Sequence, residues 1–163
     1  MKSKTDIRDT VRAGYSNVAK KGISCCGPSC GCGSSYSASA QNLAKSVGYS
    51  EKELAALPDG ANMGLSCGNP IAIASLKNGE TVVDLGSGGG FDVFIAGKKV
   101  GKKGRAIGVD MTPDMISLAR KNIASYKKRS KLNNVEFRLG EIENLPVADS
   151  TAEIGRASCR ERV

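Results

Sequence analysis

An acid followed by three spaced glycines is the part of this sequence best suited to hold a ligand. An apolar run ends at Asp84, and glycines follow at alternate positions, Gly86, Gly88 and Gly90. Glycine has no Cβ and adopts left-handed backbone conformations at little cost, so a ligand can lie directly on such a loop. The run before the loop is a predicted strand, and open α/β sheets bind ligands at the carboxyl ends of their strands. We therefore predict a ligand site at the end of this strand.

The spacing of the glycines distinguishes between two kinds of ligand. A dinucleotide-binding loop has the pattern G-x-G-x-x-G/A, and counting from Gly86 puts the bulky Phe91 where a small residue is needed. The observed acid-x-Gly-x-Gly-x-Gly pattern instead resembles motif I of the class I S-adenosylmethionine-dependent methyltransferases. That resemblance implies S-adenosylmethionine as the cofactor, and it assigns five residues to cofactor binding: Asp84, Gly86, Ser87, Gly88 and Gly90. A tight glycine turn that holds no ligand remains the alternative.

Two further predicted strand ends contribute to the same site. Asp110 follows a short apolar run about 20 residues or slightly more beyond the glycine loop, where a carboxylate can accept from ribose hydroxyls. Met111 comes directly after it. A third apolar run, 135–139, leads into a loop that could be an ordinary surface loop. In the methyltransferase fold this loop flanks the adenine, so the resemblance assigns three more residues to the cofactor: Glu141, Ile142 and Glu143.

Thiols form the second group of reactive side chains. Cys25, Cys26, Cys30 and Cys32 lie within eight glycine-rich residues, and Cys67 begins a Cys-Gly-Asn-Pro box. The chain has no histidine, which excludes mixed Cys/His zinc sites, and the spacing does not match paired C-x₂-C zinc knuckles. Such a run suits a soft, thiophilic ion that tolerates irregular geometry. A loop whose cysteines are incidental is the alternative.

The Cys-Gly-Asn-Pro box is the most specific feature of the chain. Together with Gly-Leu before it, Gly-Val-Asp-Met-Thr at 108–112 and Gly-x-Ile-Glu at 140–143, it resembles the arsenite methyltransferase family over roughly residues 5–152. The resemblance implies that Cys67 is a catalytic thiol that binds trivalent arsenic, whose lone pair attacks the cofactor methyl group. It also implies arsenite or an arsenic–thiol conjugate as substrate, a thiol reductant of the thioredoxin or glutathione type as partner, and a role in detoxification. The Cys25–Cys32 cluster would deliver arsenic or help to bind it.

Other functions remain open from the sequence. One is a different small-molecule methyltransferase whose cysteines are structural. Another is a non-enzymatic, thiol-rich binder of metalloids, which would need no cofactor pocket. A nucleic-acid methyltransferase is a more distant alternative, because the basic residues are dispersed and aromatic side chains for stacking bases are scarce.

Composition narrows the setting of the protein. The 163 residues include 24 Lys and Arg against 16 Asp and Glu, a net charge of +8. Most of the lysines fall near predicted helix ends, where cations suit the helix dipole, so we predict a solvated face and no nucleic-acid partner. We find no apolar run of about 18 residues and no signal-peptide pattern. We therefore predict no membrane span and a cytoplasmic protein with reduced thiols.

Periodicity predicts the elements that position these residues. An amphipathic helix is expected over 4–20, two short helices follow, and Ser50 with Glu53 forms a capping box that begins the second of them. Further helices are predicted at 70–76, 90–100 and 113–128, and strands at 80–85, 104–110 and 135–139. The fold class is therefore α/β: a truncated Rossmann-like class I methyltransferase sheet of about three strands with an N-terminal helical, Cys-rich extension.

We divide the chain into three parts. Residues 1–78 form the N-terminal extension with the Cys-Gly-Asn-Pro loop, residues 79–152 an incomplete S-adenosylmethionine-binding α/β domain, and residues 153–163 a tail. The tail has no period and resembles the in-frame translation of a sequencing adapter, so we exclude it from the fold. We expect an N-terminal fragment that is inactive alone, with its first strand unpaired along one edge and therefore prone to aggregation.

Overall fold

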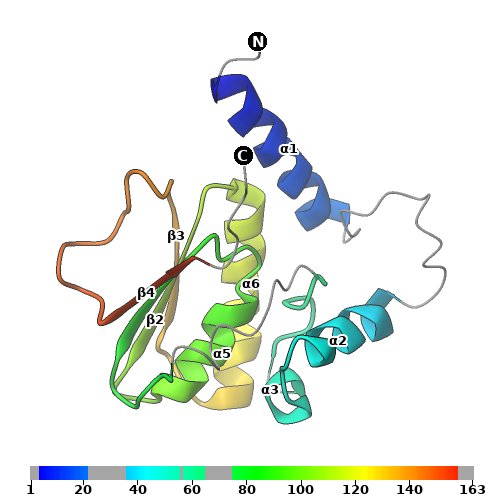
Figure 1. Cartoon of the computed structure of the whole chain (residues 1–163). Helices are drawn as coiled ribbons and strands as arrows, with labels where there is room; N and C mark the ends of the chain where they lie inside the picture. The colour runs from blue at the N-terminus through cyan, green and yellow to red at the C-terminus, as the bar shows by residue number, and fades with distance from the viewer. Residues whose placement is uncertain (1–3, 22–35, 56, 65–74, 158–163) are drawn as a thin grey trace.

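The computed structural model describes residues 4–21, 36–55, 57–64 and 75–157 (Figure 1). All six cysteines lie outside these ranges, as do residues 70–74 of the short helix that the sequence predicts. In chain order the named elements are α1 (Lys4–Lys21), α2 (Tyr36–Ser46), α3 (Glu51–Ala55), β1 (Thr81–Leu85), α5 (Phe91–Val100), β2 (Arg105–Asp110), α6 (Pro113–Ser130), β3 (Val135–Leu139) and β4 (Ile154–Ala157).

The sheet has four parallel strands in the order β3-β2-β1-β4. Helices connect β1 to β2 and β2 to β3, as parallel pairing requires, and both helices cover one face of the sheet (Figure 1). The strands expected at 80–85, 104–110 and 135–139 and the helices expected at 4–20, 90–100 and 113–128 are confirmed to within two residues at each end, whereas most of the helix expected at 70–76 lies outside the described residues. β1 lies inside the sheet, with β2 and β3 on one side of it and β4 on the other.

The helix-covered face of the sheet holds the larger core. Phe94 of α5 lies 5.2 Å from the ring of Tyr126 and 5.3 Å from that of Phe137, centroid to centroid. The buried Asn134 accepts the Tyr126 hydroxyl at 2.8 Å and donates to the carbonyl oxygen of Gly97 at 2.7 Å. Both polar side-chain atoms of Asn134 are therefore hydrogen-bonded, so this polar residue can be buried between α5, α6 and β3 without an unpaired polar group. The opposite face carries a smaller cluster on β1 and β2.

The capping box is present as expected. The Ser50 amide donates to Glu53 Oε2 at 2.9 Å, and the Glu53 amide donates to Ser50 Oγ at 3.3 Å. Glu53 also pairs with Lys99 at 2.9 Å. This short helix, α3, is thereby attached to α5 and so to the core.

The fourth strand corrects two of our expectations. Residues 154–157 pair in parallel with β1, Val82 opposite Ile154, so the expected count of about three strands and an unpaired edge of β1 is wrong. The exclusion of residues 153–163 from the fold is wrong for 154–157. The Glu153 amide donates to the Thr81 carbonyl at 3.1 Å, and the Thr81 amide donates to the Glu153 carboxylate at 2.7 Å. The physical reason is that a ladder joins backbone groups, so an extended segment can fill an open edge without a strand-like side-chain pattern.

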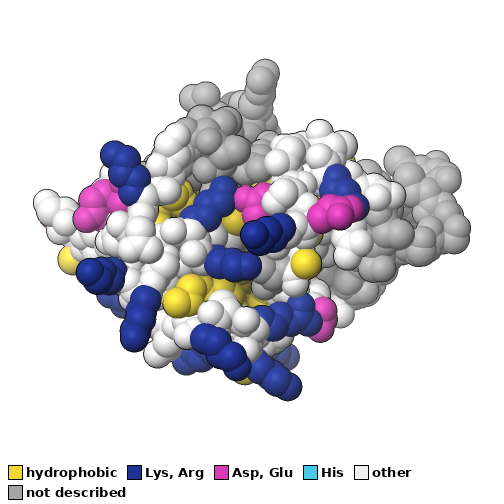
Figure 2. All heavy atoms as spheres, turned by 90° about the horizontal axis from the view of Figure 1, so that it is seen from below, with side chains coloured by type: hydrophobic (Ala, Val, Ile, Leu, Met, Phe, Trp, Pro, Cys, Tyr) yellow, Lys and Arg dark blue, Asp and Glu magenta, His cyan; other side chains and the backbone are white. Residues whose placement is uncertain are grey.

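Basic side chains gather at the end of the molecule where the strands begin. Figure 2 shows this end from below, with many Lys and Arg side chains and fewer Asp and Glu. α5 ends in Lys98 and Lys99, and α6 ends in Lys127, Lys128 and Arg129. These cations stand beside the last carbonyl groups of each helix, where they interact favourably with its dipole. Within the described ranges, no helix is both long and apolar enough to cross a membrane.

Candidate functional site

The glycine loop after β1 combines an open position with a packed one. Gly86, Gly88 and Gly90 all have left-handed backbones, with φ of 75°, 50° and 90°. Among the described residues, a Cβ added at Gly88 would meet no atom within 4 Å, whereas one at Gly90 would stand 2.5 Å from Phe137 Cζ. Gly88 therefore leaves space into which a ligand can approach the backbone, and Gly90 lets the start of α5 pack on the core.

β2 holds this loop in place. The amides of Gly86 and Ser87 both donate to the Val109 carbonyl oxygen, at 2.8 and 3.0 Å. Asp110 accepts the Gly88 amide on Oδ2 at 2.9 Å and the Thr112 amide on Oδ1 at 2.8 Å. Each carboxylate oxygen keeps a further acceptor position, so this half-buried acid can also accept from two hydroxyls of a ribose.

Buried polar groups lie beneath the loop. Asp84 is 4% exposed and Ser87 is 7% exposed. The Ser87 hydroxyl oxygen is buried and makes no hydrogen bond to the residues that the structure describes. A Cβ at Gly108 would come within 2.7 Å of this oxygen, so the bare backbone of β2 makes room for it. Most buried hydroxyls in native proteins are hydrogen-bonded, so Ser87 is an exception within the described part of the chain.

The loop after β3 stands next to Asp110. The Gly140 amide donates to the Asp110 carbonyl oxygen at 3.0 Å, and the Asn144 amide donates to the Glu141 carbonyl oxygen at 3.1 Å, which closes a tight turn. Ile142 at the tip of this turn is 64% exposed, and Leu139 before it is 50% exposed. Apolar side chains that exposed are available to cover a flat ring.

The structure thus brings the predicted cofactor residues to one end of the sheet. A bare backbone at Gly88 and a carboxylate at Asp110 lie beside an apolar loop that carries Ile142. The Ser87 hydroxyl, which has no partner among the described residues, faces Gly108 of β2. This set of groups fits an adenosine-containing ligand, because it offers acceptors for ribose hydroxyls and an apolar surface for a purine. Met111, also assigned to the cofactor, is half-buried between Asp110 and the first turn of α6. Thr112 is the N-cap residue of α6, although its side chain makes no capping hydrogen bond within the described structure.

Sequence reasoning missed the part that α1 plays at this site. Arg8 donates to Glu141 at 3.1 Å and to Glu143 at 2.7 Å, and Arg12 donates to Glu141 at 3.0 Å. Both acids that the resemblance assigns to the purine are therefore ion-paired with a helix about 130 residues earlier in the chain. The only signal in the sequence is that the two arginines are four residues apart, which places them on one face of a helix.

The sequence also did not predict that Met63 contacts the glycine loop. Met63 packs with Val18 of α1 and Met115 of α6, and a Cβ at Gly89 would stand 2.8 Å from its methyl carbon. Met63 therefore lies against the glycine loop and connects that loop to α1. Figure 1 shows α1 beside the first turn of α6, where the Lys20 ammonium also pairs with Asp114 at 3.1 Å.

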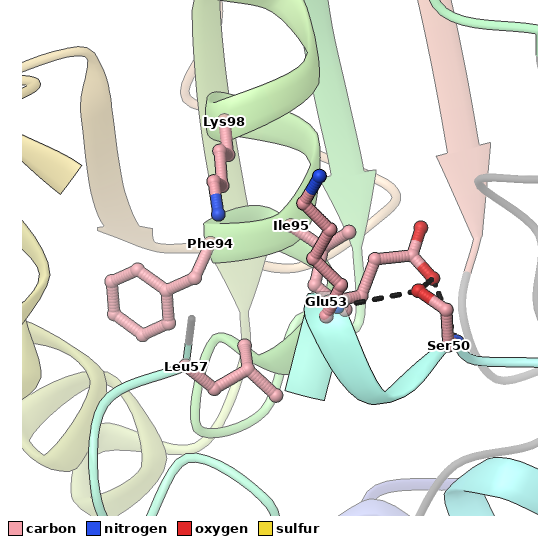
Figure 3. Close-up of a pocket in the computed structure, with 7 residues that line it drawn as sticks. Ser50, Glu53, Leu57, Phe94, Ile95 and Lys98 are labelled. Carbon is pink, nitrogen blue, oxygen red and sulfur yellow. Dashed lines mark hydrogen bonds between the residues drawn. The ribbon is translucent and has the colours of Figure 1, made fainter. Parts of the chain in front are cut away.

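The predicted thiol ligands are not among the residues that the structure describes. Cys67 and the four cysteines at 25–32 lie outside the described residues, so their expected roles stay predictions. A hollow of about 200 Å³ opens elsewhere, between α3 and α5, with Phe94, Ile95 and Leu57 as its apolar wall (Figure 3). It does not lie at the carboxyl ends of the strands, so it is separate from the predicted site.

Comparison with known proteins identifies this arrangement. The sequence model of a methyltransferase domain matches residues 76–157, half of the chain, which is the part that carries the sheet and both ligand loops. The chain belongs to the methyltransferase domain family. The α/β expectation is confirmed as a Rossmann-like methyltransferase sheet, with one strand more than expected.

One curated relative of this methyltransferase domain matches nearly all of the chain, and others match a half to three quarters of it. An arsenite methyltransferase from Halobacterium salinarum is 45% identical over 161 residues, which is 94% of this chain and 40% of the relative. One from Aquipseudomonas alcaligenes is 34% identical over 96 residues, 57% of this chain and 27% of the relative. The crystal structure of an arsenic(III) S-adenosylmethionine methyltransferase from Chlamydomonas reinhardtii superposes with a TM-score of 0.54 at 29% identity, over 74% of this chain and 38% of that one. The chain therefore spans about two fifths of the Halobacterium and Chlamydomonas proteins and about a quarter of the Aquipseudomonas protein.

Proposed function

We propose that this chain is the cofactor-binding part of an arsenite methyltransferase. The observation that carries the proposal is the 45% identity to the Halobacterium arsenite methyltransferase, because it extends over 94% of the chain and so includes the N-terminal extension. A methyltransferase of another specificity would be expected to share the α/β part and to differ in that extension.

The chain's own residues would hold S-adenosylmethionine at the end of the sheet. Asp110 would accept the ribose hydroxyls, the open backbone at Gly88 would let the ligand approach, and Ile142 would cover the purine, with Glu141 as acceptor for its amine. S-adenosylmethionine supplies an electrophilic methyl group on a sulfonium. The buried acid Asp84 lies in β1, two residues before the first glycine of the loop.

Arsenic would be the nucleophile in this proposal. Cys67 would bind trivalent arsenic as a thiolate, since the thiolate and not the thiol is the ligand. The arsenic lone pair forms the new As–C bond while the C–S bond of the sulfonium breaks, and the electron pair of that bond stays on sulfur. No proton leaves arsenic, so a general base is unnecessary, and a chain without histidine can perform the step. The protein contributes positioning of the two partners.

Two measurements test the proposal. Isothermal titration of S-adenosylhomocysteine should show one site on this chain, and arsenite should bind with a stoichiometry that falls when Cys67→Ser is introduced. Methylarsenic formation, followed by chromatography with elemental mass detection, is measured on a longer protein that contains this chain and spans the full length of the Halobacterium relative. We propose that the present chain alone forms no methylarsenic, and turnover by it would contradict this.

The same experiments separate the alternatives. Full turnover of the longer protein with Cys67→Ser would favour a different small-molecule methyltransferase. Arsenite binding without S-adenosylhomocysteine binding would favour a thiol-rich metalloid-binding protein. We further propose a cytoplasmic setting, a thiol reductant of the thioredoxin or glutathione type that recycles the thiols, and a basic face that is solvated and binds no nucleic acid.

A further inference from the structure

Helix α1 touches both sides of the proposed cofactor site. Val18, in its C-terminal half, packs with Met63, whose methyl group lies against the glycine loop at Gly89. Its N-terminal half carries Arg8 and Arg12, which pair with the loop after β3. α1 therefore contacts the loop after β3, residues 140–144, which would cover the purine, and it reaches the glycine loop after β1 through Met63. The loop after β3 is called the purine loop.

The contacts of the two arginines converge on one carboxylate. Arg8 Nη1 lies 3.1 Å from Glu141 Oε2, and Arg12 Nη2 lies 3.0 Å from Glu141 Oε1. Arg8 Nη2 also reaches Glu143 at 2.7 Å, and Arg12 Nη1 is itself held by Asp9 at 3.3 Å. Each oxygen of Glu141 thus accepts one guanidinium hydrogen and keeps one acceptor position. Glu141 is fixed in direction without losing its capacity to accept from a ligand.

We propose that Arg8 and Arg12 are positioning residues that set the selectivity of the site for adenine. They hold Glu141 so that its remaining acceptor position meets the exocyclic amine of the purine; this rests on the function proposed above. The turn that carries Glu141 is short and exposed, and without the arginines its side chain samples several rotamers. Ordering it before the ligand arrives removes that entropy cost from binding, which is how preorganisation raises affinity.

The discriminating probe is a pair of ligands that differ only at the purine amine. S-adenosylhomocysteine can donate from that amine, whereas S-inosylhomocysteine carries a carbonyl oxygen there and cannot donate to Glu141. The variant R8Q/R12Q should raise the Kd for S-adenosylhomocysteine by about three- to tenfold, because partly exposed ion pairs carry modest energies. The Kd for S-inosylhomocysteine should change by less than about twofold. If the role of α1 were purely structural, R8Q/R12Q would raise the Kd values of both ligands by the same factor.

Further variants make the test decisive. Lys45→Gln removes a similar exposed ion pair, with Glu51, far from the site and should change neither Kd. The variant R8K/R12K keeps both positive charges but not the two-donor guanidinium groups. The ratio of the two Kd values for this variant should lie between the ratios for the unmodified chain and for R8Q/R12Q. If the double variant does not fold, two other measurements replace it: Arg12→Gln alone, and the unmodified chain at about 1 M salt, which screens the ion pairs. Each should reduce the ratio of the Kd for S-inosylhomocysteine to the Kd for S-adenosylhomocysteine.

The outcomes separate this inference from the proposed function. An unmodified chain that binds neither ligand overturns both. An unmodified chain that prefers S-adenosylhomocysteine, together with an unchanged ratio in R8Q/R12Q, overturns only the inference. Tighter binding after removal of the arginines would also overturn it, since they would then be competing with the ligand for Glu141.

Discussion

Replacing Asp110 by asparagine tests the centre of the site with almost no change in shape. The carboxylate accepts two backbone amides, from Gly88 at 2.9 Å and from Thr112 at 2.8 Å. An asparagine side chain has one acceptor oxygen and one amino group, so one of those amides must face another donor. Hydrogen bonds to charged groups contribute about 1.5–3 kcal/mol, and an unsatisfied donor costs about 1–3 kcal/mol.

We therefore expect Asp110→Asn to lower the free energy of unfolding by about 1–3 kcal/mol. For a chain of this length that corresponds to a melting temperature lower by roughly 2–10 °C. The Kd for S-adenosylhomocysteine should rise at least about tenfold, because the charged acceptor for the ribose is lost and the glycine loop is released on one side. Urea unfolding followed by circular dichroism gives the first quantity, and isothermal titration gives the second.

Asp149→Asn is the matched control for this experiment. Asp149 lies exposed in the segment between β3 and β4, so the same change of charge there should leave stability and binding within error. If Asp110→Asn behaves like this control in both measurements, Asp110 neither organises the glycine loop nor meets the ribose, and our account of the site is wrong.

Two further predictions concern the scaffold around the site. Gly90→Ala should destabilise the fold by about 2–4 kcal/mol, because the new methyl group would stand 2.5 Å from Phe137 at a backbone φ of 90°. The denaturation midpoint measures this destabilisation. Gly79→Ala is the control, because Gly79 has a similar φ of 96° and a Cβ there would meet no described atom within 4 Å. Burial alone would raise the pKa of Glu53, but hydrogen bonds from Lys99 and Ser50 and the charge of Lys99 hold it at about 2. Because the pKa of Glu53 is lower in the folded protein, its carboxylate stabilises the fold above pH 4.5, and this stabilisation is lost as the pH falls toward 2. Glu53→Gln should therefore reduce the loss of stability between pH 4.5 and pH 2 by about 1 kcal/mol. An unchanged loss of stability would contradict the role given to the Glu53 carboxylate.

Local features of the chain were predictable because neighbouring residues determine them. The capping box of Ser50 and Glu53 follows from side chains three positions apart. The start of α6 follows from Pro113, whose fixed φ suits the first position of a helix. The left-handed turns at Gly86, Gly88 and Gly90 follow from a residue type that tolerates them. Period and length then set the order of strands and helices, and with it the meeting of Asp110 and the glycine loop at one sheet end.

Contacts between distant segments were not predictable in the same way. The ion pairs of Arg8 and Arg12 with Glu141 depend on how α1 packs on α6, and many acids along the chain offered equally plausible partners. Met63 reached the glycine loop through that same packing. Such placements depend on the summed fit of many side chains, which no short pattern encodes.

By itself the sequence determined the type of site: spaced glycines, a following acid and an apolar loop carry their chemistry wherever the chain folds as an α/β sheet. Only the tertiary structure decided that residues 154–157 complete the sheet beside β1, because backbone pairing depends on an open edge and hardly on side-chain identity. Only the tertiary structure placed α1 against the purine loop, because a helix carries its charges on one face and packing alone selects what that face meets.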